Sequence, residues 1–310
     1  MKVAPVVIFA YNRLEHLKKL FCSLEECTLA SETEVYIYQD GPEPRKQDSK
    51  NVKEVRAFLE SYVVSNNHFK KCILTTQNEH KGLANSVILG VSNVINQYGR
   101  VIVLEDDLIV TKDFLLYMNR ALSYYYQDKA IWSVSGNGNE TELLNKYDKD
   151  VFFDVRGDSW GWGTWKNRWN KVDWQVKDYP FFKYNWIAQY KFNRGGNNLS
   201  NMLDMQMLNK IDSWAIRWWY SQHRHKMLTV YPTHALVYNI GFDGTGTHCG
   251  KGFYNQQPLA SKQIKHKFIR YDKKYVVLQK RYVGGHDDKE WIKAKILRFL
   301  FPTLYRLYKE

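Results

Sequence analysis

The sequence lacks the features that define several common classes of protein. No stretch of its 310 residues approaches the roughly 18 to 20 consecutive apolar residues that a membrane-spanning helix requires. The four cysteines show neither zinc-ribbon spacing nor a dense disulfide framework, so we expect free thiols and a cytoplasmic location. The apolar segment VAPVVIFAY is too short for a signal peptide and has no small-residue cleavage site, so it predicts a first strand.

Sequence signatures of nucleic-acid binding are also missing. No helix-turn-helix, zinc-finger or RNA-binding aromatic motif accompanies the net charge of +13, so nucleic acid is not the expected partner. An anionic membrane surface fits this charge better. Segment 289–310 sets apolar side chains among lysines and arginines, as an interfacial helix does, although a helix docked on the domain fits the same pattern.

The composition is that of a globular chain with many aromatic residues. Hydrophobic residues make up 44% and charged residues 25%, which argues against disorder. The aromatic share of 15% is concentrated after residue 150, and it predicts either a surface that stacks on ring-shaped ligands or an aromatic core.

Two periodicities alternate along the first half of the chain. Segments that read as strands are separated by stretches with apolar residues at three- and four-residue spacing, which indicate helices. This alternation predicts an α/β fold with a mostly parallel sheet covered on both faces. The expected strands are 4–10, 34–39, 72–76, 100–105 and 130–135.

The second half has a different character. Tryptophan and glycine gather in 156–169, the segment 193–202 predicts a mobile loop, and no further βαβ unit is evident. We expect 150–260 to build the second wall of a cleft.

Charged side chains follow the expected strands of the first half. Arg13, Asp40 and Lys81 come after the first three strands, and Glu105, Asp106 and Asp107 end the fourth. The carboxyl ends of parallel strands meet at one edge, where ligands of such sheets bind. The sequence therefore predicts a charged binding edge.

Three consecutive carboxylates repel one another unless a positive charge lies among them. A divalent cation such as Mn²⁺ or Mg²⁺ suits carboxylate oxygens and retains positions for water or substrate phosphate. The alternative interpretation is an acidic loop that caps a helix.

The motifs FAYNR, YQDGP, HKGLANSV and VIVLEDDLIVTKDFLLYM resemble those of nucleotide-sugar glycosyltransferases with the GT-A fold. They are most similar to the N-acetylglucosaminyltransferase I family and to bacterial sugar transferases of polysaccharide loci. The resemblance covers roughly residues 4–250, and it is strongest over the first 120. It implies an acidic motif of the Asp-X-Asp type, which holds a metal against the donor diphosphate.

The resemblance also implies roles for single residues. Arg13 matches an arginine that contacts the nucleotide, and Asp40 matches an aspartate that binds the uracil edge. Asp107 would bind the metal, with Glu105 and Asp106 near the ribose and donor sugar. Lys81 would lie near the diphosphate or the sugar, although a solvated loop lysine fits equally well.

A catalytic base is expected in the second half. Asp212 resembles the aspartate of a DDW segment, but Ile211 stands where that segment has its first aspartate. Asp204 and Asp158 are therefore alternatives. A helix-capping aspartate is the structural interpretation of Asp212.

Two glycine-rich segments complete the expected site. Trp160, Gly161 and Trp162 match a loop beneath the donor sugar, and glycine allows a close backbone approach. His248 is a candidate metal or phosphate ligand, with Asp243 as a weaker one, although a lone histidine is often structural.

These observations predict an inverting, metal-dependent glycosyltransferase that uses a UDP-sugar, an N-acetylhexosamine by resemblance. Its acceptor would be a glycan or a lipid-linked hydroxyl in surface-polysaccharide synthesis, at the inner face of the cytoplasmic membrane. Domain 1–260 would comprise a nucleotide-binding half, 1–135, and a donor-sugar and acceptor half, 136–260, followed by the extension 261–310. The alternatives are a retaining enzyme and a catalytically silent module that binds glycan or membrane. A nucleotidyltransferase is disfavoured, because no Gly-rich phosphate loop follows the first strand.

Overall fold

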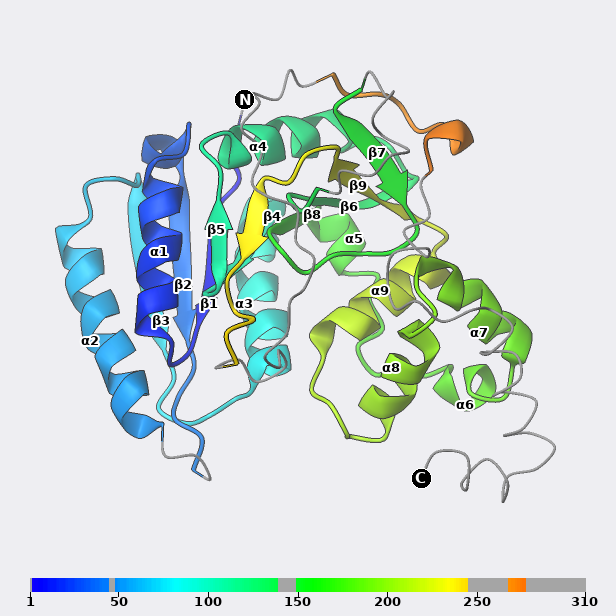
Figure 1. Ribbon diagram of the computed structural model, residues 1–310, viewed down its shortest axis with the longest axis horizontal. Helices are drawn as coiled ribbons and strands as arrows, with labels where there is room; N and C mark the ends of the chain where they lie inside the picture. The colour runs from blue at the N-terminus through cyan, green and yellow to red at the C-terminus, as the bar shows by residue number, and fades with distance from the viewer. Residues whose placement is uncertain (1, 45–47, 139–148, 245–266, 277–310) are drawn as a thin grey trace.

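The computed structural model describes residues 2–44, 48–138, 149–244 and 267–276, and within these ranges it shows an α/β fold (Figure 1). Eight strands form one sheet in the order β3-β2-β1-β4-β8-β6-β9-β7, in which β7 and β8 run antiparallel to the other six. The sheet strands are β1 (Val6–Ala10), β2 (Glu34–Gln39), β3 (Lys71–Thr76), β4 (Arg100–Glu105), β6 (Ile131–Ser135), β7 (Val151–Asp154), β8 (Trp162–Trp165) and β9 (Leu228–Pro232). A separate antiparallel pair joins β5 (Leu108–Val110) to β10 (Val237–Asn239).

Helices cover both faces of the sheet. The α-helices are α1 (Leu14–Glu25), α2 (Ser49–Ser65), α3 (Leu83–Tyr98), α4 (Phe114–Tyr124), α5 (Lys166–Trp169), α6 (Tyr179–Phe182), α7 (Trp186–Phe192), α8 (Leu199–Met207) and α9 (Trp214–Arg224). Short 3₁₀ turns are η1 (Ala30–Glu32), η3 (Asn193–Gly195) and η4 (Lys273–Tyr275).

The residues of β1 show how the two faces are divided. Val6 and Ile8 pack into one core with residues of α1, α2 and α4. Val7 and Phe9 point the other way, into a core shared with α3, α8 and α9. Because β1 is buried on both faces, its sequence is a continuous apolar run and does not alternate.

The second half of the chain adds strands to the sheet of the first half. β8 pairs with β4, and β9 pairs in parallel with β6, so residues from both halves share one sheet. A loop was expected at 193–202, but 193–195 form η3 and 199–202 begin α8, so most of this segment is helical. In the described part of the chain, Cys22, Cys27 and Cys72 are free thiols, as the sequence predicts.

Many of the tryptophans after residue 150 pack against one another in the core. The ring of Trp162 stacks on those of Trp169 and Trp214, with centroids 5.8 and 5.0 Å away, and lies 5.4 Å from that of Trp218. Trp132 joins them, 4.6 Å from Trp218. The aromatic enrichment therefore serves largely to fill the core beneath α9.

Within the described ranges, no helix has the length and apolar character needed to cross a membrane. Segment 289–310 and His248 lie outside the described residues.

Candidate functional site

The expected charged edge is present at the carboxyl ends of the parallel strands. β1, β2 and β4 are paired in parallel, so the residues after Ala10, Gln39 and Leu104 emerge on one side. The backbone N–H of Tyr11 donates to Asp106 Oδ2 over 3.2 Å, which ties the turn after β1 to the turn after β4. The fold thus brings together the charged residues that the sequence placed there.

Arg13 supplies the positive charge among the three carboxylates. Its Nη2 pairs with Asp106 Oδ1 and also donates to Asp107 Oδ2 over 3.1 Å. Burial works to lower the pKa of the Arg13 guanidinium, but the charges of Asp106 and Asp107 outweigh it and raise that pKa. The expected repulsion is therefore relieved in part by Arg13, the residue that directly precedes α1.

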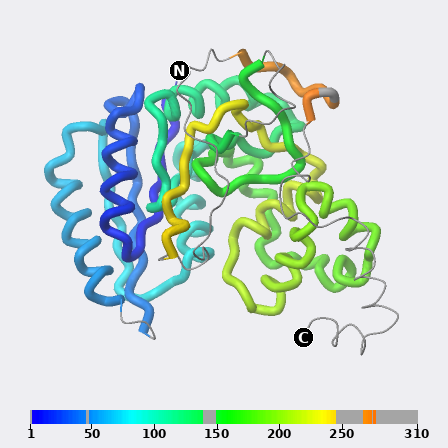
Figure 2. Tube along the Cα trace, in the orientation of Figure 1, coloured from blue at the N-terminus to red at the C-terminus, as the bar shows by residue number. Residues whose placement is uncertain are grey.

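Asp107 retains one oxygen with no protein partner in the described part of the chain. The residue is 6% exposed, and the buried Oδ1 has no hydrogen-bond donor there. Gly241 follows β10, which runs beside β5 (Figure 2), and a Cβ at Gly241 would lie 2.3 Å from Asp107 Oδ2. Ile240 also donates its N–H to the Asp107 carbonyl over 2.8 Å. A glycine at 241 is thus required for this close approach.

Glu105 and Asp106 are both shifted toward the neutral acid. Burial, with the charges of Asp107 and Asp106, raises the pKa of Glu105 to about 8, although Arg13 and a hydrogen bond with Trp214 oppose the shift. Burial also raises the pKa of Asp106, against the opposing charge of Arg13. A group that brings positive charge to this edge would favour ionisation of both.

Asp40 organises the turn before α3. Its Oδ1 accepts from the N–H of Lys81 over 2.8 Å, and its Oδ2 accepts from the N–H of Gly82 over 2.9 Å. His80 Nδ1 lies 3.0 Å from Oδ2, and the imidazole lies 5.4 Å from the ring of Tyr11. The Lys81 ammonium is partly exposed, 3.7 Å from Glu79. Asp40 therefore fixes the backbone of this turn, and the uracil contact predicted for it stays a prediction.

Asp212 lies against the same turn from the side of α9. Its Oδ2 accepts from the N–H of Ala84, in the first turn of α3, over 3.3 Å. The side chain is exposed, as a proton acceptor for a bound hydroxyl must be. Asp212 thus contacts the N-terminus of α3, as the helix-capping interpretation expects, and its carboxylate is also exposed.

The three tryptophans of the glycine-rich segment have different environments. Trp162 and Trp165 are fully buried, and the contact predicted between Trp162 and the donor stays a prediction. Trp160 is only partly buried and lies edge-on to Phe242, with ring centroids 5.8 Å apart. Gly161 between them has a φ of +59°, in the left-handed region that favours glycine. Trp160 is therefore the tryptophan of this segment that is partly exposed.

The alternative bases are engaged in structural contacts. Asp204 is 8% exposed and accepts from the Tyr179 hydroxyl over 3.1 Å. Asp158 Oδ1 accepts from the N–H groups of Ser159 and Trp160, and its Oδ2 accepts from the Ser135 hydroxyl over 3.0 Å. Asp243 pairs with His16 at 3.2 Å. Among the three candidate bases, Asp212 is therefore the exposed one; Asp243, a candidate metal or phosphate ligand, is exposed as well.

The donor set fits a divalent cation held jointly with a ligand. No group of three histidine, cysteine or acidic side chains converges within the described residues. Asp106 uses both oxygens on Arg13 and Tyr11, whereas Asp107 Oδ1 is buried without a partner there. Mg²⁺ is commonly bound through one or two carboxylates together with substrate phosphates and water. Asp107 matches this mode of binding.

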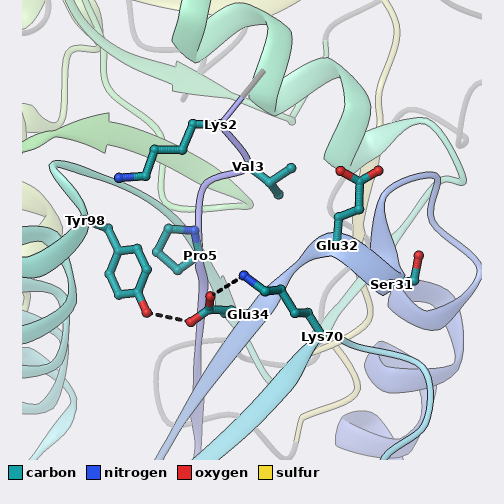
Figure 3. Close-up of a pocket in the computed structure, with 8 residues that line it drawn as sticks. All are labelled: Lys2, Val3, Pro5, Ser31, Glu32, Glu34, Lys70 and Tyr98. Atoms are coloured by element: carbon teal, nitrogen blue, oxygen red, sulfur yellow. Dashed lines mark hydrogen bonds and ion pairs between the residues drawn. The ribbon is translucent and has the colours of Figure 1, made fainter.

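A separate cavity of ≈ 380 Å³ lies at the opposite end of the strands (Figure 3). Glu34 is its central charge, and hydrogen bonds from Tyr98 and Lys70 lower the pKa of that carboxyl. Because Glu34 is already paired, the cavity differs in its chemistry from the acidic edge, although Glu32 also lines it.

Four residues of the site were not singled out by sequence. Tyr11 and His80 flank predicted residues, Trp214 follows Asp212 by two positions, and Gly241 begins a glycine-rich segment. Their proximity to predicted positions was the available signal, whereas their contacts depend on the folded chain.

Comparisons with known proteins show partial likenesses to solved glycosyltransferases. A mannosyltransferase, PcManGT of Pyrobaculum calidifontis, solved with GDP-Man and Mn²⁺, covers 54% of this chain and 46% of its own, with 13% identity and a TM-score of 0.37. The structure of S. aureus TarS 1-349 covers 73% of this chain and 57% of its own length, with 10% identity and a TM-score of 0.41. The structure of that fragment with UDP-GlcNAc covers 46% of this chain and 36% of its own length, with 14% identity and a TM-score of 0.32.

This chain thus spans between about a third and somewhat over half of those three structures. No family model and no curated protein matches the sequence.

Proposed function

We propose that this chain is an inverting, metal-dependent glycosyltransferase of the GT-A class, which transfers a sugar from a UDP-sugar. The proposed sugar is an N-acetylhexosamine, and the proposed acceptor is a hydroxyl of a glycan or lipid-linked glycan in surface-polysaccharide synthesis. The observation that carries the proposal is the buried Oδ1 of Asp107, which has no partner among the described residues and lies beside the Arg13 ion pairs at the carboxyl end of β4. An anionic donor with its cation would complete this arrangement.

The donor end of the site would be held by the turns after β1, β2 and β4. Arg13 orients Asp106 and Asp107 through its ion pairs, and Asp40 fixes the backbone of Lys81 and Gly82. Asp107 would hold Mn²⁺ or Mg²⁺ against the donor diphosphate. When bound, the cation relieves the negative charge that develops on the departing diphosphate.

Asp212 is the proposed general base. The acceptor oxygen attacks the anomeric carbon while its proton passes to a carboxylate oxygen of Asp212. The bond between that carbon and the diphosphate oxygen breaks, and the diphosphate departs with the bonding electron pair. A single displacement from the opposite face inverts the anomeric centre. The partly buried Trp160 is the proposed aromatic contact of the donor sugar.

The first test is a thermal-shift screen with UDP-, GDP-, dTDP- and CMP-sugars, each with Mn²⁺ and with chelator. A ligand that binds only the folded state raises its stability, so we expect a Mn²⁺-dependent shift with UDP-sugars. Asp107→Asn should remove the Mn²⁺ dependence, whereas Asp113→Asn, which changes an aspartate with no side-chain cap bond before α4, should keep it. If no nucleotide shifts the transition, or the shift survives in chelator, the proposed donor site is wrong.

A further inference from the structure

We infer that α6 and α7 form a membrane-contact surface for an anionic bilayer, distinct from the acidic edge. The surface comprises large apolar side chains that point to solvent, at Phe181, Tyr184, Trp186, Ile187 and Tyr190. Phe181 is 81% exposed, Tyr184 74% and Trp186 65%. Exposed apolar side chains gathered in so short a segment mark an interaction site more often than chance scatter.

The opposite side of the same two helices is firmly anchored. Phe182 and Phe192 are buried, and their rings lie 4.9 and 5.3 Å from the ring of Tyr220 on α9. Gln189 holds the connection by donating to the carbonyls of Phe182 and Lys183. The exposed rings are therefore presented by a fixed scaffold. Trp186, Ile187 and Tyr190 are exposed because Gln189 and Phe192 already occupy the inward face of α7.

The charges around these rings are positive. Lys177, Lys183, Lys191 and Arg194 are exposed, and the Lys183 ammonium lies 4.7 Å from the centroid of the Tyr184 ring. The acidic residue of segment 177–194, Asp178, is engaged by Arg224 and Tyr220, each at 3.0 Å. Within segment 177–194, the surface therefore carries a net positive charge that it can offer to a partner.

Tryptophan and tyrosine beside lysine are the side chains found at membrane interfaces. The rings have an apolar body and a polar edge, and lysine keeps its ammonium in water while its stem lies on apolar surface. Attraction to anionic headgroups adds to the burial of the rings. Figure 1 places α6 and α7 in the lower right of the molecule, while the turn after β2 lies at its lower edge.

Other occupants fit these observations less well. Protein interfaces are enriched in aromatic residues but depleted in lysine. A two-fold symmetric dimer through this surface would place the lysine-rich patch of one copy against the same patch of the other. The lysine- and arginine-rich segment 289–310 would meet like charge in the same way. An anionic lipid surface is complementary to both the rings and the charges.

The test is co-sedimentation of the full chain with vesicles of phosphatidylcholine alone or with about a quarter of phosphatidylglycerol. The readout is vesicle binding without any sugar donor, so it does not depend on the proposed enzymatic activity. We expect binding to the anionic vesicles that weakens with salt. The double variant Tyr184→Ser and Trp186→Ser should bind about tenfold more weakly. Lys183→Gln and Lys191→Gln should each cost about fivefold at low salt.

The matched control changes exposed residues of the same kinds elsewhere, Tyr126→Ser with Lys129→Gln, and should bind as the wild type does. Trp186→Phe should retain binding while losing part of the tryptophan quenching by brominated lipid. Equal binding of all variants, or equal binding to neutral vesicles, would overturn the inference. So would a wild-type dimer that Tyr184→Ser and Trp186→Ser convert to monomer, which would make this surface a self-association interface.

Discussion

Asp40 and Asp212 hold the same turn of backbone from two sides. Asp40 accepts from the N–H groups of Lys81 and Gly82, and Asp212 accepts from that of Ala84. The two carboxylates come from the end of β2 and the start of α9, more than 170 positions apart in the chain. The proposed nucleotide contact and the proposed base are therefore linked through the first residues of α3.

Gly82→Ala should disturb this link. Gly82 has a φ of +80°, and a Cβ there would lie 2.9 Å from Asp212 Oδ2. Gly99 has the same φ at the end of α3, but a Cβ there would meet nothing within 4 Å. Both alanine variants should lose about 1 kcal/mol of unfolding free energy through backbone strain, measured by urea denaturation. Gly82→Ala should lose more stability than Gly99→Ala, and it alone should reduce transfer. Equal losses would show that the Asp212 contact contributes nothing.

Asp212→Asn should abolish glycosyl transfer and leave UDP affinity nearly unchanged. The amide keeps the shape of the side chain but cannot take the proton, so a fall of about 10² to 10⁴ in kcat is expected. Isothermal titration with UDP and Mn²⁺ supplies the binding control. Asp204→Asn should retain transfer, because Asp204 is buried against Tyr179. An active Asp212→Asn would remove Asp212 from the role of base.

Arg13→Gln should destabilise the fold by about 3 kcal/mol. It removes the partner of two largely buried carboxylates and leaves their charges uncompensated. Mn²⁺ should restore more stability to this variant than it adds to the wild type, since a cation would replace the missing charge. Arg224→Gln breaks an exposed pair with Asp178 and should cost less than about 1 kcal/mol. Urea midpoints with and without Mn²⁺ give the comparison, and a Mn²⁺ response identical to that of wild type would argue against a cation at Asp107.

Trp160→Phe and Trp162→Phe should separate donor binding from packing. Trp162 is fully buried among other tryptophans, so the smaller ring leaves a cavity and lowers the unfolding free energy by about 1 to 3 kcal/mol. Trp160 is partly exposed, and its replacement should raise KM for the donor with little loss of stability. Thermal melts and donor KM values measured on both variants decide this, and an unchanged KM in Trp160→Phe would exclude that ring from the donor site.

His223 should make the fold less stable in acid. Burial, with nearby Arg224, Arg194 and Lys191, lowers the pKa of this imidazole from 6.5 to about 4. The unfolded chain therefore binds the proton more readily, and stability falls as the pH drops from about 6.5 toward 4, by on the order of 2 kcal/mol. In His223→Gln this part of the pH dependence should disappear from urea midpoints measured between those pH values. A variant with the same acid sensitivity as the wild type would assign it to other groups.

The first half of the fold was predictable because its signals are local. The expected strands at 34–39 and 100–105 have the observed bounds, and the other three differ by one or two residues. Parallel pairing then places all their carboxyl ends together, so the charged edge followed from strand order alone. The second half resisted prediction because long-range packing decides it: 193–202 is rich in loop-forming residues, yet it is ordered as η3 and α8 against α9.

The sequence by itself determined that three carboxylates end a buried strand, because the apolar run and the acidic trio are contiguous. Only the tertiary structure decided which charge faces them, because Arg13 and Asp106 lie 93 positions apart. The same holds for Trp160 and Trp162, two positions apart, of which one is partly exposed and the other buried. Spacing along a chain sets the face on which a side chain lies, whereas its neighbours come from segments that meet only when the sheet and its helices pack.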